Sequence, residues 1–374
     1  MRLKPGYKHI YRERERRNDM GTSYSDTIHV RKGEELNKEA LFEFIRKNIV
    51  EVPDGTLEIE QFGAGQSNLT YLLKIGVWEA VLRRPPLGPV APKAHDMNRE
   101  YKVLSGLYPL YPTAPKPYIF SDDEKVVGSP FFIMERRKGI VLDTKIPERI
   151  TYSKELGRKI SSLMVDKLVE LHQIDYKQTA LVNLSKPDGF MERQVSGWIK
   201  RYARSKTDEI AEVDELTKWL GKNIPVSGEP GIIHYDYKLN NAMFSEDFSE
   251  MTGLFDWEMT TVGEPLADLG VALGYWTGAD DPELLKTGLG KPSVTVKEGF
   301  YSRREFIEQY AKRSRRDVSN IHFYHTFAYF KLAVICQQIY FRYKKGQTDD
   351  PRFAHFDQSV ANLIQHALNT AKGV

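Results

Sequence analysis

The sequence predicts an α+β protein with two lobes, a small antiparallel-sheet lobe followed by a mostly helical lobe. Three observations support this class. The chain has 374 residues, which is longer than one ordinary domain. Strand-like alternation is concentrated between residues 57 and 134, and helix-like periodicity dominates from residue 154 onward. We therefore expect a basic N-terminal tail at residues 1–36, an N-lobe at 37–137 and a C-lobe at 138–374.

Composition limits the classes of function. Apolar residues make up 41% of the chain and aromatic residues 11%, which is enough for a sizeable core. The 54 basic residues nearly balance the 51 acidic ones, so no nucleic-acid partner is expected. The single cysteine, Cys336, excludes intramolecular disulfides and suits a reducing compartment. The basic N-terminus lacks a following apolar segment, and no apolar run reaches the length of a membrane span. We therefore expect a cytoplasmic protein without a secretory signal or a membrane partner.

The N-lobe is predicted to begin with a helix at 38–48, capped by Asn37. Strands are then expected at 57–62, 69–75, 79–84 and 130–134. Between the first two strands lies a glycine-rich turn that contains Gly65 and Ser67. Small residues there let backbone N–H groups approach the phosphates of a nucleotide, and the Ser67 hydroxyl adds a donor. The alternative interpretation is an ordinary hairpin turn.

Other residues of this lobe are candidates for binding the same nucleotide. Arg83, on the third strand, is placed to bind the α- and β-phosphates, and Glu100, in a predicted helix at 98–104, is placed to orient Arg83. An ordinary surface ion pair is the alternative for these two residues. The last strand leaves the lobe just before a glycine, so backbone groups around Glu135 and Arg137 are candidates for cradling adenine.

Amphipathic helices are predicted to build the C-lobe. The clearest one runs from residue 154 to 173, and its buried face is expected to contain Leu163, Val165, Leu168 and Leu171. His172, at its end, is expected to be a packed structural histidine rather than a ligand. Further helices are expected near 187–204, at 210–221, from Arg303 onward and at 323–343.

The C-lobe also carries the residues predicted to do chemistry. Residues 234–241 read His-Tyr-Asp-Tyr-Lys-Leu-Asn-Asn, and Asp256 follows fifteen residues later. Phosphoryl transfer needs a carboxylate that orients the attacking hydroxyl and accepts its proton, which we assign to Asp236. It also needs a cation to offset charge on the moving phosphoryl group, which we assign to Lys238. Asn241 and Asp256 offer the hard oxygen ligands that Mg²⁺ prefers.

A short hairpin is predicted to hold both metal ligands. Apolar residues at 242–244 and 251–255 flank a polar turn. Asn241 and Asp256 would then lie at strand ends, where a rigid scaffold can position them. The alternative is a polar surface hairpin whose Asp and Asn side chains only form turns.

The spacing of these residues resembles the catalytic loop and metal-binding strand of protein-kinase-like folds. More narrowly, the chain resembles the aminoglycoside phosphotransferase-like family, in the branch that includes the kinase-like domain fused to some acyl-CoA dehydrogenases. The resemblance extends from about Phe62 to Leu363. It rests on the segments Gly65–Thr70, Val81–Pro86, Arg99–Glu100, Leu171–His172, Gln194–Trp198, 234–241, Asp256–Glu258, Asp268–Gly270 and Phe330–Ile335. It implies a bilobal kinase-like fold that binds ATP with Mg²⁺ and phosphorylates a hydroxyl.

Two positions differ from what the resemblance leads one to expect. Arg83 stands where most kinase-like folds have lysine, although arginine is common in this branch. Tyr235 stands where the family usually has glycine, between the His and the Asp of the catalytic loop. Protein kinases have a large residue at that position, so we expect the loop geometry to be kept and the access of substrate beside Asp236 to differ.

The acceptor is expected to be a small molecule rather than a protein. Protein kinases insert a long activation segment after the metal-binding Asp, whereas only eleven residues separate Asp256 from Asp268 here. Asp268 is expected either to brace the catalytic loop through hydrogen bonds or only to cap the helix that follows Gly263.

Charge gives one indication of the acceptor. Between Gly299 and Lys345 the chain has ten Lys or Arg residues and three acidic ones. This balance suits an anionic or partly apolar acceptor, such as a hydroxyacyl thioester of coenzyme A, better than a polycationic antibiotic. The alternative is that these basic residues form a solvated face. Two other functions stay open: an aminoglycoside or other antibiotic kinase, and a catalytically silent ATP-binding protein of the same fold.

Overall fold

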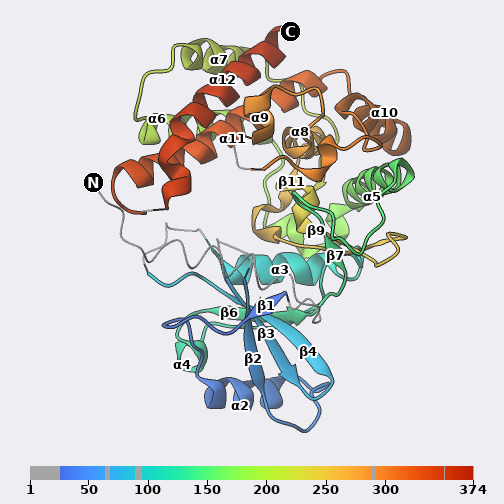
Figure 1. Ribbon diagram of the computed structural model, residues 1–374, viewed down its shortest axis with the longest axis vertical. Coiled ribbons are helices and arrows are strands. Elements are labelled where there is room, and N and C mark those ends of the chain that lie inside the picture. Colours follow the sequence, from blue (N-terminus) through green and yellow to red (C-terminus); the bar gives the residue numbers. More distant parts are fainter. Residues whose placement is uncertain (1–25, 64–67, 89–94, 288–290, 349, 374) are drawn as a thin grey trace. The chain divides into compact units, whose positions relative to one another are not determined.

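The computed structural model describes residues 26–63, 68–88, 95–287, 291–348 and 350–373 (Figure 1). The chain divides into two compact units. One comprises the described residues up to His95 together with Asp122–Phe131, and the other comprises Asp96–Ser121 and the described residues from Phe132 onward. Strands dominate the first unit and helices the second, so the predicted bilobal α+β class is confirmed. Gly65, Ser67 and most of the basic tail lie outside the described residues.

The first unit is an antiparallel sheet covered by helices. Its elements are β1 (Thr27–Ile28), α2 (Lys38–Asn48), β2 (Glu58–Phe62), β3 (Leu69–Ile75), β4 (Trp78–Arg84) and α4 (Glu124–Val127). The strands β1 to β4 pair in chain order, and all three pairings are antiparallel. Asn37 caps α2 as predicted, because its side chain accepts the N–H of Ala40 at 3.1 Å. Phe44 of α2 meets Phe131 edge to face at 5.3 Å, which joins the helix to the core of this unit.

Arg84, at the end of β4, is a structural cation. Its buried guanidinium donates to the Tyr71 hydroxyl, to the carbonyl of Glu34 and to the carbonyl of Val127, each at 2.8 Å. Successive side chains of a strand point to opposite faces, so Arg83 lies on the other face of the sheet. The two neighbouring arginines therefore have different surroundings.

The second unit is mainly helical. Its helices are α3 (Met97–Leu107), α5 (Lys154–Gln173), α6 (Phe190–Ser205), α7 (Glu212–Lys222), α8 (Pro265–Tyr275), α9 (Glu283–Thr287), α10 (Arg303–Ser314), α11 (Ile321–Lys344) and α12 (Phe356–Lys372). Single 3₁₀ turns are η1 (Tyr176–Gln178), η2 (Ala180–Asn183), η3 (Leu239–Asn241), η4 (Trp257–Met259), η5 (Val294–Val296) and η6 (Pro351–His355). Its strands are β5 (Pro117–Ser121), β6 (Phe131–Glu135, whose first residue belongs to the first unit), β7 (Ile140–Val141), β8 (Gly231–Ile233), β9 (Ala242–Phe244), β10 (Met251–Leu254) and β11 (Thr261–Gly263).

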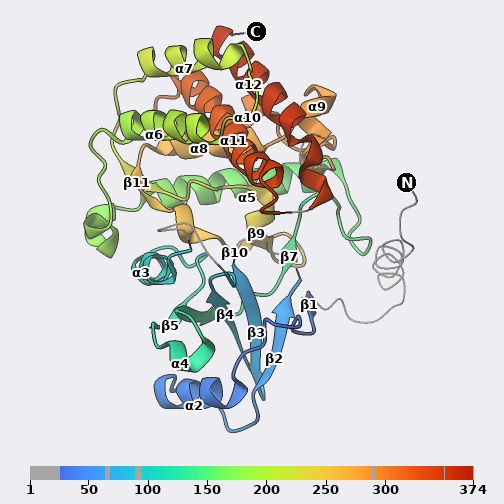
Figure 2. The same ribbon diagram turned by 90° about the vertical axis from the view of Figure 1, so that its left-hand side faces the viewer.

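The helix α11 is the centre of this unit. It packs along both α8 and α12, and Figures 1 and 2 show α11 beside α12 from two directions. Most of its side chains are buried, including many aromatic ones. Within the described residues, no helix combines the length and apolar character needed to cross a membrane. The apolar composition of α11 is thus explained by burial inside the unit.

The helix α5 matches its predicted bounds and supports the catalytic loop. Ser153 caps it by accepting the N–H of Leu156 at 3.2 Å. Its buried face differs by one position from the prediction, since Met164 is buried and Leu163 is only partly so. The Tyr237 hydroxyl donates to the carbonyl of Met164 at 2.8 Å, which fastens the loop to this helix.

Two short antiparallel pairings hold the ends of the catalytic loop, which we define as residues 234–241. The strand β8 leads into the loop and pairs with β11, with Ile233 opposite Thr261. The strand β9 follows the loop and pairs with β10, with Ala242 opposite Leu254. The predicted hairpin is therefore confirmed, and it includes a register shift between Met251 and Gly253.

Candidate active site

His234 begins the catalytic loop and connects two parts of the site. Its Nε2–H donates to the carbonyl of Phe255 at 2.9 Å, and its Nδ1 accepts the backbone N–H of Asp236 at 3.3 Å. A carbonyl oxygen can only accept, so the ring proton lies on Nε2. Burial lowers the pKa of His234 and keeps this ring neutral. The imidazole therefore ties Asp236 to the residue that precedes Asp256.

Asp268 braces the loop from the first turn of α8. Its fully buried carboxylate accepts the backbone N–H of His234 at 2.6 Å and that of Tyr235 at 2.8 Å. The prediction that Asp268 braces the loop is confirmed. The alternative, that it only caps the helix, is wrong, because Glu264 is the N-cap and its side chain accepts the N–H of Leu266.

His172 completes this support from the end of α5. Its Nε2 donates to the Asp268 carboxylate at 3.2 Å, and its Nδ1 lies 2.7 Å from the Tyr310 hydroxyl. His172 is thus the packed structural histidine that the sequence predicted. Burial by itself would raise the pKa of Asp268, but the hydrogen bonds from the His172 side chain and the His234 backbone help to lower it overall. The carboxylate is therefore kept in its charged form.

Tyr235 has an unusual backbone conformation. Its φ angle is 65°, in the left-handed region that glycine adopts most readily. The ring is buried, lies 5.7 Å from the ring of Phe190 and places its hydroxyl 3.3 Å from the Gln194 side chain. The loop can thus keep its geometry with a large residue at this position, as expected. Because the ring points into the core, it adds no exposed surface beside Asp236, and the expected change in substrate access does not come from this side chain.

Asp236, Lys238 and Asn241 lie together in the catalytic loop. The Lys238 ammonium is 2.8 Å from Asp236 Oδ2. The Asn241 side-chain amide donates to the same oxygen at 3.1 Å and to the Asp236 carbonyl at 3.0 Å. Tyr275, a partly buried residue at the end of α8, places its ring 5.0 Å from the Lys238 ammonium. Lys238 and Asn241 therefore hold the carboxylate in one orientation.

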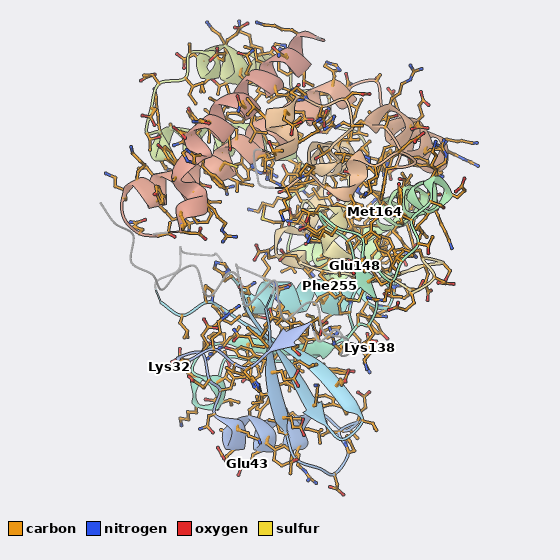
Figure 3. All side chains as sticks on the ribbon, viewed as in Figure 1. Lys32, Glu43, Lys138, Glu148, Met164 and Phe255 are labelled. Atoms are coloured by element: carbon orange, nitrogen blue, oxygen red, sulfur yellow. The ribbon has the colours of Figure 1, made fainter. Side chains whose placement is uncertain are left out.

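Asp256 follows β10 and is brought close to Asn241 by the residue before it. The N–H of Phe255 donates to the carbonyl of Asn241 at 2.9 Å. Figure 3 labels Phe255 and Met164, whose backbone carbonyls accept the hydrogen bonds from His234 and Tyr237. Asp256 itself has a left-handed φ of 68° and stands directly before η4. This conformation turns the chain sharply out of the strand at the predicted metal ligand.

The donor set of Asn241 and Asp256 fits Mg²⁺. The amide nitrogen of Asn241 is engaged with Asp236, which leaves its carbonyl oxygen as the donor for a cation. In the described part of the chain, no group of three or more His, Cys, Asp or Glu side chains forms a metal cluster. Two oxygen ligands suit an ion that usually keeps waters and binds substrate phosphates.

Arg99, in the first turn of α3, supports the segment that follows Asp256. Its guanidinium donates to the carbonyl of Glu258 at 2.7 Å and to that of Thr260 at 2.5 Å. The sequence singled out Arg99 only as a neighbour of Glu100 and assigned it no contact. An arginine in a helix has no local signal that reveals carbonyl partners about 160 residues away.

The predicted nucleotide contacts are divided between the two units. Arg83 lies on β4 of the first unit and is largely buried, and Glu100 lies on α3 of the second unit and is also buried. Their predicted pairing stays a prediction. The burial of both side chains argues against the alternative of an ordinary exposed ion pair.

Glu135 and Arg137 form an ion pair with each other in the second unit. Arg137 Nη2 lies 3.0 Å from Glu135 Oε2 and donates to the carbonyl of Pro112 at 2.7 Å. The N–H of Lys116 donates to Glu135 Oε2 at 3.1 Å, and the N–H of Glu135 donates back to the carbonyl of Lys116 at 2.8 Å. The two side chains therefore stiffen this segment. Because the N–H of Glu135 is already bonded to Lys116, the predicted contacts to adenine would come from other backbone groups near Glu135 and Arg137.

Lys331 is a further residue of the site that sequence reasoning missed. It lies on α11 and is almost fully buried, and its ammonium donates to the carbonyl of Tyr235 at 2.7 Å. The same ammonium lies 3.7 Å from the centre of the Tyr235 ring. Lys331 thus stabilises the left-handed residue next to Asp236. The available signal was a lysine in the middle of a strongly apolar, aromatic segment.

Replacing Lys331 by methionine is expected to change how stability depends on pH. Burial lowers the pKa of Lys331 from 10.5 to about 8. Between these pH values the unfolded chain binds more protons than the folded one, so the wild type gains stability with rising pH relative to Lys331→Met. The difference in the free energy of unfolding should shift by about 2 kcal/mol between pH 7.5 and 9.5.

Urea unfolding of both proteins across this pH range measures the shift. Lys218→Met, on the exposed face of α7, is the matched control and should show no such change relative to wild type. A pH-independent difference between wild type and Lys331→Met would show that the buried ammonium has an ordinary pKa.

Comparisons with known proteins agree with this geometry. The model of the phosphotransferase enzyme family matches residues 58–306. Acyl-CoA dehydrogenase family member 11 of Gallus gallus is 32% identical over 327 residues, which cover 86% of this chain and 41% of that protein. Acyl-CoA dehydrogenase family member 10 of Mus musculus is 30% identical over 325 residues, covering 86% of this chain and 30% of that protein. The chain thus spans less than half the length of these curated relatives.

Solved structures show the same fold. An inferred aminoglycoside phosphotransferase from Ralstonia eutropha superposes with a TM-score of 0.77 at 28% identity, over 91% of this chain and 99% of that one. Choline kinase from Cryptosporidium parvum superposes with a TM-score of 0.62 at 14% identity, over 90% of this chain and 96% of that one. At that identity the second likeness concerns the fold alone. The chain belongs to the phosphotransferase enzyme family, with a kinase-like fold and relatives among the acyl-CoA dehydrogenase family members.

Proposed function

We propose that this protein uses ATP and Mg²⁺ to transfer the γ-phosphoryl group to a hydroxyl of a small molecule, and that an anionic metabolite such as a hydroxyacyl-CoA is the acceptor. The arrangement of Asp236, Lys238 and Asn241 in one loop, with Asp256 on the adjoining hairpin, carries this proposal. Family membership supports a kinase-type enzyme.

Asp236 has the central role in the proposed reaction. The acceptor hydroxyl would face this carboxylate, which orients it and takes its proton as the oxygen attacks the γ-phosphorus. A new P–O bond forms, the bond to the bridging oxygen breaks, and ADP leaves. Lys238, 2.8 Å from the carboxylate, lies where it can offset the charge of the moving group.

The remaining residues would bind the nucleotide and its metal. Asn241 and Asp256 are proposed to hold Mg²⁺, which offsets charge on the phosphates when bound. Arg83, oriented by Glu100, and the turn containing Gly65 and Ser67 are proposed to bind the phosphates. Backbone groups near Glu135 and Arg137 are proposed to hold adenine. A cytoplasmic location also stays a prediction.

A small acceptor is favoured over a protein by the segment after Asp256. It consists of η4 and β11 and then enters α8 directly, so Asp268 lies in the first turn of that helix. The paired strands β8 and β11 leave no long activation segment at this point. The platform that a protein kinase uses for a peptide would therefore have no counterpart between these two carboxylates.

ATP turnover with a panel of acceptors tests the proposal. Purified protein with Mg²⁺ is given hydroxyacyl-CoAs, aminoglycosides, macrolides, choline and small sugars, and phosphorylated product is measured by mass spectrometry. Product from one acceptor class, with ATP consumption lost when Mg²⁺ is removed, is the expected result. Product from aminoglycosides alone would favour an antibiotic kinase. Binding of ATP without turnover would favour a catalytically silent protein, and failure to bind ATP would overturn the proposal.

A further inference from the structure

A pocket of about 290 Å³ lies within the second unit beside the catalytic loop. Lys238 and Tyr275 form part of its wall, and the Lys238 ammonium lies 2.8 Å from the Asp236 carboxylate. The wall also includes residues of α9, α11 and α12, residues before η5, and Asp143 and Thr144 after β7. Its volume is close to the lower end of the range for small-molecule sites, about 300–1,000 Å³. The pocket therefore adjoins Lys238, the residue that pairs with the carboxylate proposed to take the acceptor's proton.

The charged residues of the pocket are mostly cationic. Three lysines, Lys238, Lys286 and Lys291, line it, and Asp143 is the one carboxylate among its described lining residues. Lys238 is already paired with Asp236. Lys291 has no carboxylate partner within the described parts of the chain, and it is exposed. The pocket thus offers an ammonium group that an anionic ligand can bind without displacing a protein carboxylate.

Lys286 is the second cation available to a ligand. Its ammonium lies 3.2 Å from a carboxylate oxygen of Glu283, one helical turn away, and 3.3 Å from the carbonyl of Ala279. The Glu283 side chain is 72% exposed. Such an exposed ion pair stabilises the fold by only about 0–1 kcal/mol. A bound anion can therefore replace Glu283 as the partner of Lys286, or share the ammonium with it.

The pocket also has an apolar side. Five leucines line it: Leu239, Leu284, Leu285, Leu332 and Leu363. Leu284 is 57% exposed and lies on the same short helix as Lys286. Exposed apolar surface beside ammonium groups is a favourable surface for a ligand that is aliphatic in one part and anionic in another.

We propose that this pocket binds the phosphoryl acceptor, and that the acceptor is a hydroxyl compound with a short aliphatic segment and an anionic group held by Lys286 and Lys291. The anionic group is a carboxylate or a phosphate. This inference rests on the proposed function. A polycationic acceptor would place its ammonium groups against three lysines, which like-charge repulsion disfavours.

Matched probes that differ only in charge test the pocket. Isothermal titration calorimetry on the full chain, without ATP, compares a short hydroxyalkanoate with its amide, and a hydroxyacyl-CoA provides the phosphate-bearing arm. Wild type should bind at least one of the anionic probes about tenfold or more tightly than the amide. Lys291→Glu and Lys286→Gln should each weaken that binding about tenfold. Lys218→Glu, an exposed charge reversal on α7 outside the pocket, should leave it unchanged.

The outcomes separate this inference from the proposed function. If anionic and neutral probes bind alike, or if Lys291→Glu behaves like Lys218→Glu, the pocket inference is wrong. If ATP-dependent phosphorylation occurs on an acceptor whose KM is unchanged in Lys291→Glu, the pocket inference fails and the proposed function stands. Lysine-dependent anion binding with no phosphorylation of any acceptor would overturn the proposed function and the acceptor assignment together, leaving only an anion site.

Discussion

Replacement of Asp236 by asparagine is expected to lower kcat by about 10²–10⁴-fold, which is the contribution that a positioned general base usually makes. Asparagine has nearly the same shape as aspartate, and it can keep the hydrogen bonds that Asp236 accepts from Asn241 and Lys238. It cannot take the proton of the acceptor hydroxyl. The effect should therefore fall on kcat, with little change in the affinity for ATP.

Steady-state kinetics of the wild type and Asp236→Asn, with the acceptor identified by the panel, measure this effect. Circular dichroism and ATP titration show whether the variant is folded and binds nucleotide. Asp208→Asn, an exposed substitution of the same type, is the matched control and should retain full activity. A loss smaller than about threefold in Asp236→Asn would remove Asp236 from the chemical step.

Asparagine at position 268 is expected to have the largest effect on stability. The Asp268 carboxylate is fully buried and accepts hydrogen bonds from two backbone N–H groups and from His172. An amide in the same place loses the negative charge and can turn its own N–H groups toward these donors. The free energy of unfolding should fall by about 3–5 kcal/mol, which is the usual cost of breaking a buried charged arrangement. Turnover should fall as well, since the loop that carries Asp236 is no longer braced.

The pH dependence of this stability difference is a second signature. The pKa of Asp268 is lowered below its ordinary 3.8 in the folded protein. The stabilisation by the carboxylate is therefore fully present above about pH 4 and is lost as pH falls through the lowered pKa. Urea unfolding of wild type and Asp268→Asn should show a constant difference from pH 5 to 8 that narrows below pH 4. A difference of less than about 1 kcal/mol at pH 7, similar to that of Asp208→Asn, would contradict the bracing role.

Much of the fold could be predicted because the relevant signals are local. The strands β2, β3 and β4 and the helices α2 and α5 were placed within one or two residues, since each has several residues of clear periodicity or a capping residue. The strands β1 and β7, of two residues each, were missed because so short a segment has no period. The helix α12 was also missed, although its buried stripe packs on α11 and is as regular as that of α5.

The candidate site likewise combines residues that a local motif could indicate with supporting residues that it could not. Asp236, Lys238, Asn241 and the hairpin before Asp256 lie within 23 residues of His234, so their order and spacing alone indicated phosphoryl transfer. Their supports come from elsewhere in the chain: Asp268 of α8 and Lys331 of α11 contact the loop, and His172 of α5 holds Asp268. Residues so far apart have no spacing rule that relates them, and only packing brings them together.

The sequence by itself determined the fold class, the family and the residues predicted to do chemistry. The signals for these are strand alternation, helical periodicity and a contiguous polar motif, and each involves residues that are close together in the sequence. Only the tertiary structure decided three further features. It made Lys331 a buried partner of the left-handed Tyr235. It made Asp268 a brace rather than a cap. It also gathered residues from Asp143 to Leu363 into one pocket beside Lys238. All three features depend on contacts between segments that are distant in the sequence, and the first two also depend on the burial of a charged group. Such contacts and such burial arise only when the chain packs.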